Sequence, residues 1–246
     1  MLPKWFLAYR PHVSWIEFNQ NLEVDLLNDY VYFEVAKVAC STIKSRLRTV
    51  AAPGIPMPNA VHPAVLNSPF SKPFQLPPRI MRNVLSGTGF TRFTFVREPV
   101  ERVVSAYLDK MCREDKDGNR SEQRKRFMAA FLPDKAQTDE VSFDQFVDII
   151  AEVEDSRLLD KHWRPQADLM FQPVQEFDFI GRFDRFEDDW DKLAERLELP
   201  VKIERTNVTW HSTSAGSKVD DIVTPNARRK IEARYAKDFE LYASIE

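Results

Sequence analysis

The stretch Tyr30–Leu47, with the sequence YVYFEVAKVACSTIKSRL, constrains the fold more than any other part of the chain. Residues Val31–Val35 form a β-branched and aromatic run that is typical of a buried strand. Small residues follow in Ala36–Ser41, and Thr42–Ala51 then has the apolar spacing of a helix. The pattern therefore predicts a strand, a tight loop and a helix in direct succession.

Such a strand–loop–helix unit can bind an anion at the start of its helix. The first backbone N–H groups of a helix lack partners within it, and the helix dipole is positive there. Lys37 adds a full charge, and Ser41 and Thr42, one of which we expect to begin the helix, add hydroxyl donors. A phosphate or sulfate group fits these properties. On this stretch alone, an ordinary turn with an exposed lysine is an equally good interpretation.

The loop differs from the Walker A phosphate-binding loop, whose pattern is G-x-x-x-x-G-K-[ST]. It contains no glycine, and its lysine precedes the helix instead of lying in the first turn. A nucleotide-dependent kinase or NTPase would need that loop and Mg²⁺ ligands near it, so this class is disfavoured. The sequence has no His, Cys and Asp cluster that suggests a metal site.

A second stretch, Phe93–Met111 with the sequence FTFVREPVERVVSAYLDKM, favours the anion-binding interpretation. Phe93–Val96 is a predicted strand, and Arg97 leaves its carboxyl end, where open α/β sheets bind their ligands. Pro99 suits the first turn of the helix that follows, and Ser105 lies about two turns into it. Taken alone, an ion-pairing Arg97 and a packing Ser105 would be the safer interpretation.

Together the two stretches resemble the sulfotransferases that use 3′-phosphoadenosine-5′-phosphosulfate (PAPS). VAKVACSTIKSRL is similar to their 5′-phosphosulfate loop, and FVREPVERVVSAYLDK to their 3′-phosphate motif. The strongest resemblance is to the carbohydrate sulfotransferases of the chondroitin and HNK-1 type, family 2. Lys161–Asp191 follows that family's HW…YD-x-(I/V)-G-x-(F/Y)-E pattern, and Thr206–Gly216 with the ending ARYAKDFELYA is a weaker match. The likeness covers the chain from about Tyr30 to the C-terminus.

The resemblance implies an α/β fold with a P-loop-NTPase-like central parallel sheet flanked by helices, in a single domain over residues 1–246. Residues 1–28 would be a cover segment or an edge strand, and residues 30–246 the family-like region. The implied activity is transfer of a sulfuryl group from PAPS to a hydroxyl group of a carbohydrate, with PAP as the product. A sulfotransferase acting on a small molecule or lipid, and a non-catalytic module that binds PAP or a glycan, stay open as alternatives.

The resemblance also assigns roles to residues of this chain. Lys37 would neutralise the sulfate and the departing 5′-phosphate. Arg97 and Ser105 would hold the 3′-phosphate and select PAPS over ATP. No metal is required, because cationic side chains neutralise the charge. The 5′-phosphate would be held by the backbone N–H groups from Ala39 to Thr42 and by the hydroxyls of Ser41 and Thr42. In this stretch, the implied cofactor-binding residues are Lys37, Val38, Ala39, Cys40, Ser41 and Thr42.

Two histidines are candidates for the base that takes the proton from the acceptor hydroxyl. His62 lies in Ala52–Arg79, a long segment with half of the sixteen prolines that starts beside the proposed site. Several sulfotransferase families place a histidine base after this first strand–helix unit, although a loop histidine held by backbone hydrogen bonds is the alternative. His162 is the second candidate. Trp163 beside it would be a stacking platform for a sugar, or the two would be a packed structural pair.

Composition disfavours some functions and bears on the location. The net charge of −3 disfavours general nucleic-acid binding, and no run approaches the length of a membrane helix. The two cysteines, Cys40 and Cys112, give neither a disulfide framework nor a metal set. Secretory-pathway relatives carry a C-x-x-C at the positions of Met170 and Pro173, and an N-terminal membrane anchor. Because this sequence shows neither, we expect a soluble, cytoplasmic, bacterial protein.

Further elements are predicted outside these motifs. Ser142 begins a helix and has capping-box spacing to Gln145. Phe177–Ile180 is a predicted strand, and Glu187 after it is a predicted structural anchor. Thr224 caps a last helix. The mixed charges between residues 110 and 126 indicate a solvated helix or loop, with a contact surface for an anionic acceptor as the alternative.

Overall fold

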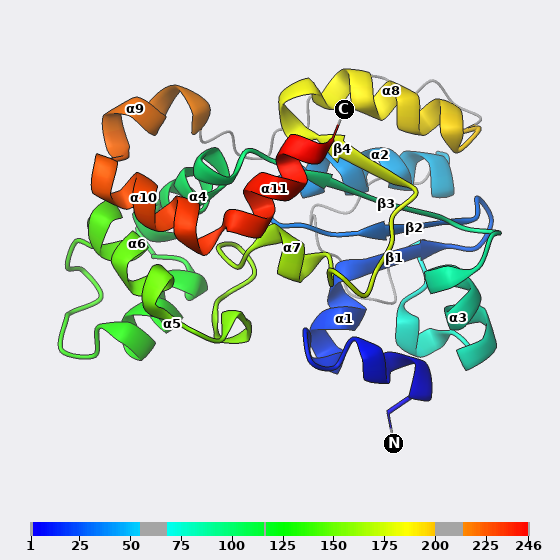
Figure 1. Ribbon diagram of the computed structural model, residues 1–246, viewed down its shortest axis with the longest axis horizontal. Helices are drawn as coiled ribbons and strands as arrows, with labels where there is room; N and C mark the ends of the chain where they lie inside the picture. The colour runs from blue at the N-terminus through cyan, green and yellow to red at the C-terminus, as the bar shows by residue number, and fades with distance from the viewer. Residues whose placement is uncertain (1, 55–67, 116, 200–213, 246) are drawn as a thin grey trace. The chain divides into compact units, whose positions relative to one another are not determined.

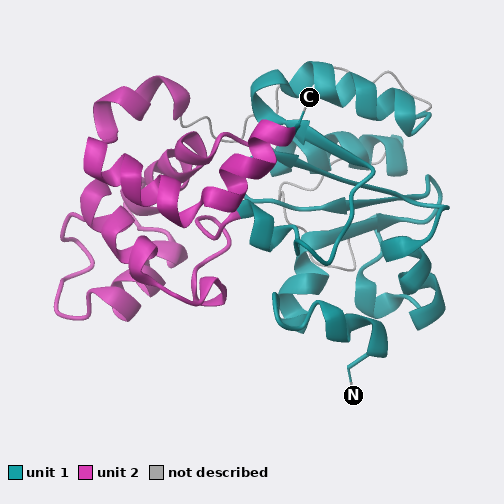
Figure 2. Cartoon of the chain, in the orientation of Figure 1, with its two compact units in different colours: residues 1–96, 166–210, 245 teal, residues 97–165, 211–244, 246 magenta. Residues whose placement is uncertain are grey.

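The computed structural model describes residues 2–54, 68–115, 117–199 and 214–245. The chain divides into two compact units, shown in different colours in Figure 2. Unit 1 comprises residues 1–96, 166–210 and 245, and unit 2 comprises residues 97–165, 211–244 and 246. The predicted 5′ loop therefore belongs to unit 1, while Arg97 begins unit 2. That the two units form a single domain stays a prediction.

A sheet is the centre of unit 1, and in the described residues it has four strands in the order β1-β2-β3-β4. The strands are β1 (Leu22–Asp25), β2 (Tyr30–Phe33), β3 (Thr91–Val96) and β4 (Phe179–Arg182). β2, β3 and β4 are parallel neighbours, and β1 pairs antiparallel with β2. The predicted α/β class, with helices flanking a parallel sheet, is confirmed, and the antiparallel β1 is a difference from it.

β1 is antiparallel because a short turn joins it to β2. The Asp25 carboxylate accepts hydrogen bonds from the N–H groups of Leu27 (2.9 Å) and Asn28 (3.1 Å), and Asp29 has a φ of 49°. A connection this short joins antiparallel strands, whereas parallel strands need a long crossover. The segment 1–28 thus contains the edge strand that was one of its two predicted forms.

Helices cover both faces of this sheet (Figure 1). One face carries α1 (Trp15–Asn21) and α3 (Pro78–Ser86), and the other carries α2 (Cys40–Ala51) and α8 (Phe186–Arg196). Along β2, Val31 and Phe33 join the core cluster with α1 and α3, whereas the rings of Tyr30 and Tyr32 contact Phe93. Alternate residues of a strand point to opposite faces, so burial on both faces explains why every residue of β2 is apolar or aromatic. The predicted strand, Val31–Val35, extended two residues beyond the observed end at Phe33.

The N-terminal segment also covers the sheet, as its other predicted form required. Phe6 and Phe18 are buried in the same cluster as Phe33, and Phe18 stacks on Phe171 with ring centroids 5.3 Å apart. Its 3₁₀ helix is η1 (Lys4–Ala8). The other short helices of unit 1 are η3 (Pro73–Gln75), α7 (Gln166–Leu169) and η6 (Phe183–Arg185).

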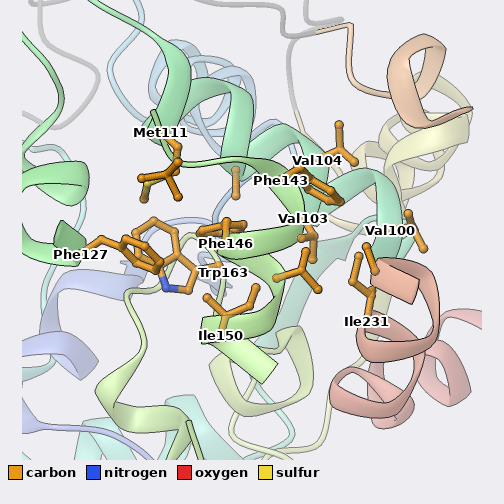
Figure 3. Packing of buried hydrophobic residues seen from close by; sticks show 14 of the residues in the cluster. Val100, Val103, Val104, Met111, Phe127, Phe143, Phe146, Ile150, Trp163 and Ile231 are labelled. Atoms are coloured by element: carbon orange, nitrogen blue, oxygen red, sulfur yellow. The ribbon is translucent and has the colours of Figure 1, made fainter. Parts of the chain in front are cut away.

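Unit 2 is helical and packs around one hydrophobic cluster (Figure 3). The Trp163 ring lies edge to face against Phe127 and Phe146, with centroids 5.8 and 5.6 Å away, and Val103 and Ile231 belong to the same cluster. Its helices are α4 (Pro99–Tyr107), the π-helical η4 (Leu108–Cys112), α5 (Glu122–Phe131), α6 (Phe143–Glu152), η5 (Ser156–Leu158), η7 (Gly216–Lys218), α9 (Val219–Ile222), α10 (Pro225–Arg234) and α11 (Ala236–Ser244).

The predicted helix caps of unit 2 are present. Ser142 and Thr224 each accept a hydrogen bond from the backbone N–H three residues on, at 3.2 and 3.1 Å. The last predicted helix is interrupted at Tyr235, whose buried hydroxyl donates to the carbonyl of Trp163 (2.5 Å). That bond ties the junction of α10 and α11 to the hydrophobic cluster.

Candidate active site

The loop between β2 and α2 has an unusual backbone for a segment without glycine. Lys37 has a φ of 72° and Ala39 a φ of 64°, so both lie in the left-handed region. Each such residue costs about 1–2 kcal/mol relative to the right-handed form, and it persists only where the surroundings enforce it. A left-handed residue next to right-handed ones turns successive N–H groups toward one concave, anion-binding side. The loop has two left-handed residues although its sequence lacks the Walker A glycines.

The helix that follows begins without a side-chain cap. α2 begins at Cys40, its N-cap is Ala39, and no side chain caps it; its first turn holds no acidic residue. The prediction that Ser41 or Thr42 begins this helix was wrong by one or two positions. Both hydroxyls instead lie inside the first turn, beside the backbone N–H groups. A helix start with this composition favours an anion.

Hydrophobic anchors hold the loop in place. Val35 and Val38 are fully buried, as is Ile43 of α2, whereas Lys37 and Ala39 are half-buried. The Val38 side chain therefore belongs to the core, and only its backbone is suited to the predicted contact with a phosphate. The alternation of anchored and half-buried positions keeps the polar side of the loop toward solvent.

Arg97 begins unit 2, two residues before α4, and is held by Glu101 of that helix. Its Nε and Nη2 donate to Oε2 of Glu101 at 3.2 and 3.0 Å, and only 8% of its side chain is exposed. Burial lowers the pKa of the Arg97 guanidinium, and the hydrogen bond that it donates to Glu101 opposes this. An arginine in such a setting keeps its charge at neutral pH. It is therefore a buried cation with a planar fork of donors.

Ser105 lies on α4, the same helix as Glu101. A glycine from a later segment, Gly216, lies close to Glu101. Ser105 is 2% exposed, eight residues after Arg97. A methyl group added at Gly216 would lie 3.1 Å from Oε1 of Glu101, so the backbone of Gly216 packs against this carboxylate. Gly216 ends the polar segment that matched the family weakly, most of which lies outside the described residues.

His162 is part of a histidine–aspartate pair in unit 2. Its Nδ1 lies 2.5 Å from Oδ1 of Asp160, which also accepts the backbone N–H of His162 (3.0 Å). An ionised carboxylate only accepts hydrogen bonds, so Nδ1 carries the proton and Nε2 is the basic atom. Burial lowers the pKa of the imidazole, although Asp160 acts in the opposite direction. The neutral, proton-accepting form therefore dominates at neutral pH.

The other histidine candidate and the neighbouring tryptophan have different outcomes. His62 lies outside the described residues, so its proposed role stays a prediction. Trp163 is 2% exposed and packed within the hydrophobic cluster. Its interpretation as a sugar-stacking platform was wrong, because neither face of a ring in this position is available to a ligand.

Glu187 is the structural anchor that the sequence predicted. Its carboxylate accepts both hydrogen bonds of Arg46 Nη2 at 2.7 and 2.9 Å. The guanidinium lies over the rings of Phe186 and Trp190, 5.0 and 5.1 Å from their centroids. Arg46 comes from α2 and the other three residues from α8, so this contact joins the two helices on one face of the sheet.

The charged segment between residues 110 and 126 is largely self-paired, as its solvated interpretation predicted. Lys125 pairs with Glu122 and Arg120 with Glu114, each at 2.7 Å. Arg124 is an exception, because it is 2% exposed and donates to the carbonyl of Met111 (2.9 Å). In the described parts of the chain, no group of three or more His, Cys, Asp or Glu side chains has the arrangement of a metal site.

The predicted site residues therefore fall into two described groups. Lys37, Val38, Ala39, Cys40, Ser41 and Thr42 lie together in unit 1, and Arg97, Ser105 and His162 belong to unit 2. Sequence reasoning missed the left-handed conformation of the loop. It also missed Asp160 and Glu101, the partners of His162 and Arg97. The sequence signal for these two acids was their spacing of two and four residues from the groups they bind.

The sequence profile of the sulfotransferase family matches residues 22–243. The chain belongs to this family. The chain is 29% identical over 207 residues to carbohydrate sulfotransferase 14 of Danio rerio, a match that covers 78% of this chain and 54% of the relative. The sulfotransferase 14 of Mus musculus is 28% identical over 222 residues, with 87% and 57% covered.

Carbohydrate sulfotransferase 12 of Xenopus laevis is 25% identical over 256 residues, a match that covers 90% of this chain and 59% of the relative. The chain thus spans somewhat more than half the length of these relatives. No solved structure matches it. Among the described residues, none of the helices combines the length and the apolar character needed to cross a membrane.

Proposed function

We propose that this chain transfers a sulfuryl group from PAPS to a hydroxyl of a carbohydrate. Membership of the sulfotransferase family supports the reaction class, and the names of the relatives support a carbohydrate acceptor. The observation that carries the proposal is the loop after β2, whose left-handed Lys37 and Ala39 precede a helix start without a side-chain cap. This arrangement binds an anionic group through the backbone.

Each unit by itself carries groups of the chemical kind that one anionic end of PAPS would need. In unit 1, the backbone from Lys37 to Thr42 and the hydroxyls of Ser41 and Thr42 would hold the 5′-phosphate. In unit 2, the buried guanidinium of Arg97 and the hydroxyl of Ser105 would hold the 3′-phosphate. Because Arg97 is paired with Glu101, a phosphate there would either share the guanidinium with that carboxylate or displace the carboxylate from it. Selection of PAPS over ATP would follow from this second contact.

Lys37 would supply most of the charge stabilisation. PAPS, when bound, supplies the activated sulfuryl group. The Lys37 ammonium would neutralise the negative charge that develops on the sulfate and on the departing 5′-phosphate. The fixed backbone N–H groups would require little reorganisation, which is how a preorganised site lowers a barrier.

A histidine would take the proton from the acceptor hydroxyl. His162 has the geometry of a general base, since Asp160 fixes Nδ1–H and leaves Nε2 to accept a proton. His62 is the other candidate. Separate His62→Ala and His162→Ala variants, assayed with PAPS at saturating concentration, would distinguish them, because only loss of the base lowers kcat strongly with PAP affinity retained.

The test of the cofactor is calorimetric titration with PAP, with AMP and ATP as controls, for the wild type and Arg97→Ala. We expect tight PAP binding, weak AMP and ATP binding, and about a 100-fold loss of PAP affinity in the variant. PAP that binds no better than AMP would refute the 3′-phosphate assignment.

Screening of acceptors with PAPS then tests the substrate class. We expect sulfation of a carbohydrate hydroxyl. Turnover only with a small molecule or lipid would reject the carbohydrate acceptor, and PAP binding without turnover would indicate a binding module. Fractionation of the source cells would test the inferred cytoplasmic location, and a gel-shift experiment the inferred lack of nucleic-acid binding. The inferred bacterial origin stays a prediction.

A further inference from the structure

A chain of four buried charges lies beside the loop in unit 1. The Lys44 ammonium of α2 contacts the Glu34 carboxylate and lies 3.5 Å from Oε1 of Glu23. Oε2 of Glu23, in β1, lies 2.9 Å from the Lys72 ammonium. The side chains of these four residues are only 2–8% exposed. Negative and positive charges alternate, so the cluster is neutral and each ion has a partner.

The position of this cluster links it to the candidate site. Glu34 is the first residue after β2, where the loop begins. Lys44 lies in the second turn of α2, the helix that follows the loop. The backbone N–H of Glu34 also donates to the carbonyl of Asn21 (2.7 Å). The ion pair therefore closes the base of the segment that contains Lys37 and Ala39.

We propose that Glu34 and Lys44 are positioning residues for the 5′-phosphate, and that their buried ion pair holds the loop in its left-handed, anion-binding form. The inference rests on the proposed function, since it deepens the assignment of this loop. Two disfavoured residues persist in the loop only while its ends are fixed. Glu23 would stabilise the pair as the second partner of Lys44, and Lys72 would neutralise Glu23 in turn.

A second ion pair on the same helix, with a buried arginine and a half-buried glutamate, provides the control. Arg46 lies two residues after Lys44 on α2, is 1% exposed, and pairs with Glu187 of α8. Glu187→Gln weakens this pair and thus tests the general effect of losing an ion pair from α2. The substitution changes neither a residue of the loop nor one assigned to a ligand.

The readout is the affinity for PAP divided by the affinity for adenosine 3′-monophosphate, both measured by calorimetry. The two ligands differ in the 5′-phosphate, so the ratio isolates the contribution of the loop. We expect Glu34→Gln and Lys44→Met to lower this ratio about tenfold, while binding of adenosine 3′-monophosphate stays unchanged. Lys44→Arg, which keeps the charge, is expected to retain most of the wild-type ratio.

The outcomes separate this inference from the proposed function. A wild type that binds both ligands equally would refute the 5′-phosphate site itself. A wild type with a large ratio that Glu34→Gln leaves unchanged, or that Glu187→Gln lowers equally, would overturn the positioning role. Glu34→Gln preserves the side-chain shape and leaves Lys44 paired with Glu23, so it decides the question if Lys44→Met does not fold.

Discussion

The loop after β2 and the helix after β3 follow neighbouring parallel strands, yet they offer different groups to an anion. At the start of α2 no side chain caps the helix, and the N-cap Ala39 is left-handed. At the start of α4 the carboxylate of Glu98 accepts the backbone N–H of Glu101 (2.7 Å). The first helix start is suited to a ligand's negative charge, whereas in the second a protein carboxylate already has that place.

This difference explains why the two predicted anion sites use different chemistry. The 5′ part relies on backbone N–H groups, whose direction depends on the loop conformation. The 3′ part relies on two side chains, that of Arg97 just before α4 and that of Ser105 within this helix. A backbone site is sensitive to conformation and tolerant of side-chain identity, and a side-chain site has the opposite sensitivities. Substitutions in each part test this contrast.

Replacement of Lys37 is expected to have the largest effect. Lys37→Ala should lower kcat about 10²–10³-fold, because it removes the charge that stabilises the transition state. Alanine is also disfavoured at a φ of 72°, so the substitution does not free the backbone. Steady-state rates with saturating PAPS measure the effect, and Lys37→Arg is the charge-retaining control. Equal rates for the wild type and Lys37→Ala would contradict the assigned role.

Arg97→Lys is expected to weaken PAP binding about tenfold, since an ammonium cannot reproduce the bidentate geometry of a guanidinium. Calorimetry with PAP measures the loss. Glu98→Gln is the control on the same element: it weakens the cap of α4 without removing a predicted phosphate ligand. If the cap variant lost as much affinity as Arg97→Lys, the helix start and not the side chain would be the binding group.

The side-chain part of the site was the easier one to predict from sequence. Arg97, Pro99 and Ser105 have fixed spacing on an element whose apolar periodicity is clear, and the structure keeps Arg97 at the strand end as expected. The parallel strands and the caps at Ser142 and Thr224 were predictable for the same reason, because each depends on a local pattern.

The backbone part of the site could not be predicted in the same way. Positive φ is usually signalled by glycine, and neither Lys37 nor Ala39 gives that signal. Their conformation depends on contacts that are distant in sequence, such as the link from Lys44 through Glu23 to Lys72. The burial of Trp163 was likewise decided by tertiary packing, against Phe127 in α5 and Phe146 in α6.

Glycine substitutions test the backbone difference directly. Ala39→Gly should leave the free energy of unfolding unchanged or raise it by up to about 1 kcal/mol. Glycine adopts the left-handed conformation without strain, and this gain offsets the greater entropy that glycine gives the unfolded chain. Ala106→Gly, the same substitution inside α4, should lower it by about 1–2 kcal/mol through lost helix propensity and a lost buried methyl group. Urea unfolding compares the two, and a loss of stability of the same size in both would refute the contrast.

The smallest effect is expected on the pH dependence of stability. Lysine and arginine side chains keep their charge between about pH 5 and 8, so both anion sites are unchanged in this range and the effect of His162 can be measured separately. Burial lowers the pKa of His162, so the unfolded chain binds the proton more readily than the folded chain. Its contribution to stability is therefore fully present above the ordinary histidine pKa of about 6.5, and is lost as the pH falls through the folded value. His162→Gln should reduce the loss of unfolding free energy between about pH 7 and pH 5, while PAP affinity at pH 7 stays the same. Chemical unfolding at a series of pH values measures this slope. A variant with the slope of the wild type would show that His162 is not held neutral in the fold, and would remove the basis for its role as the proton acceptor.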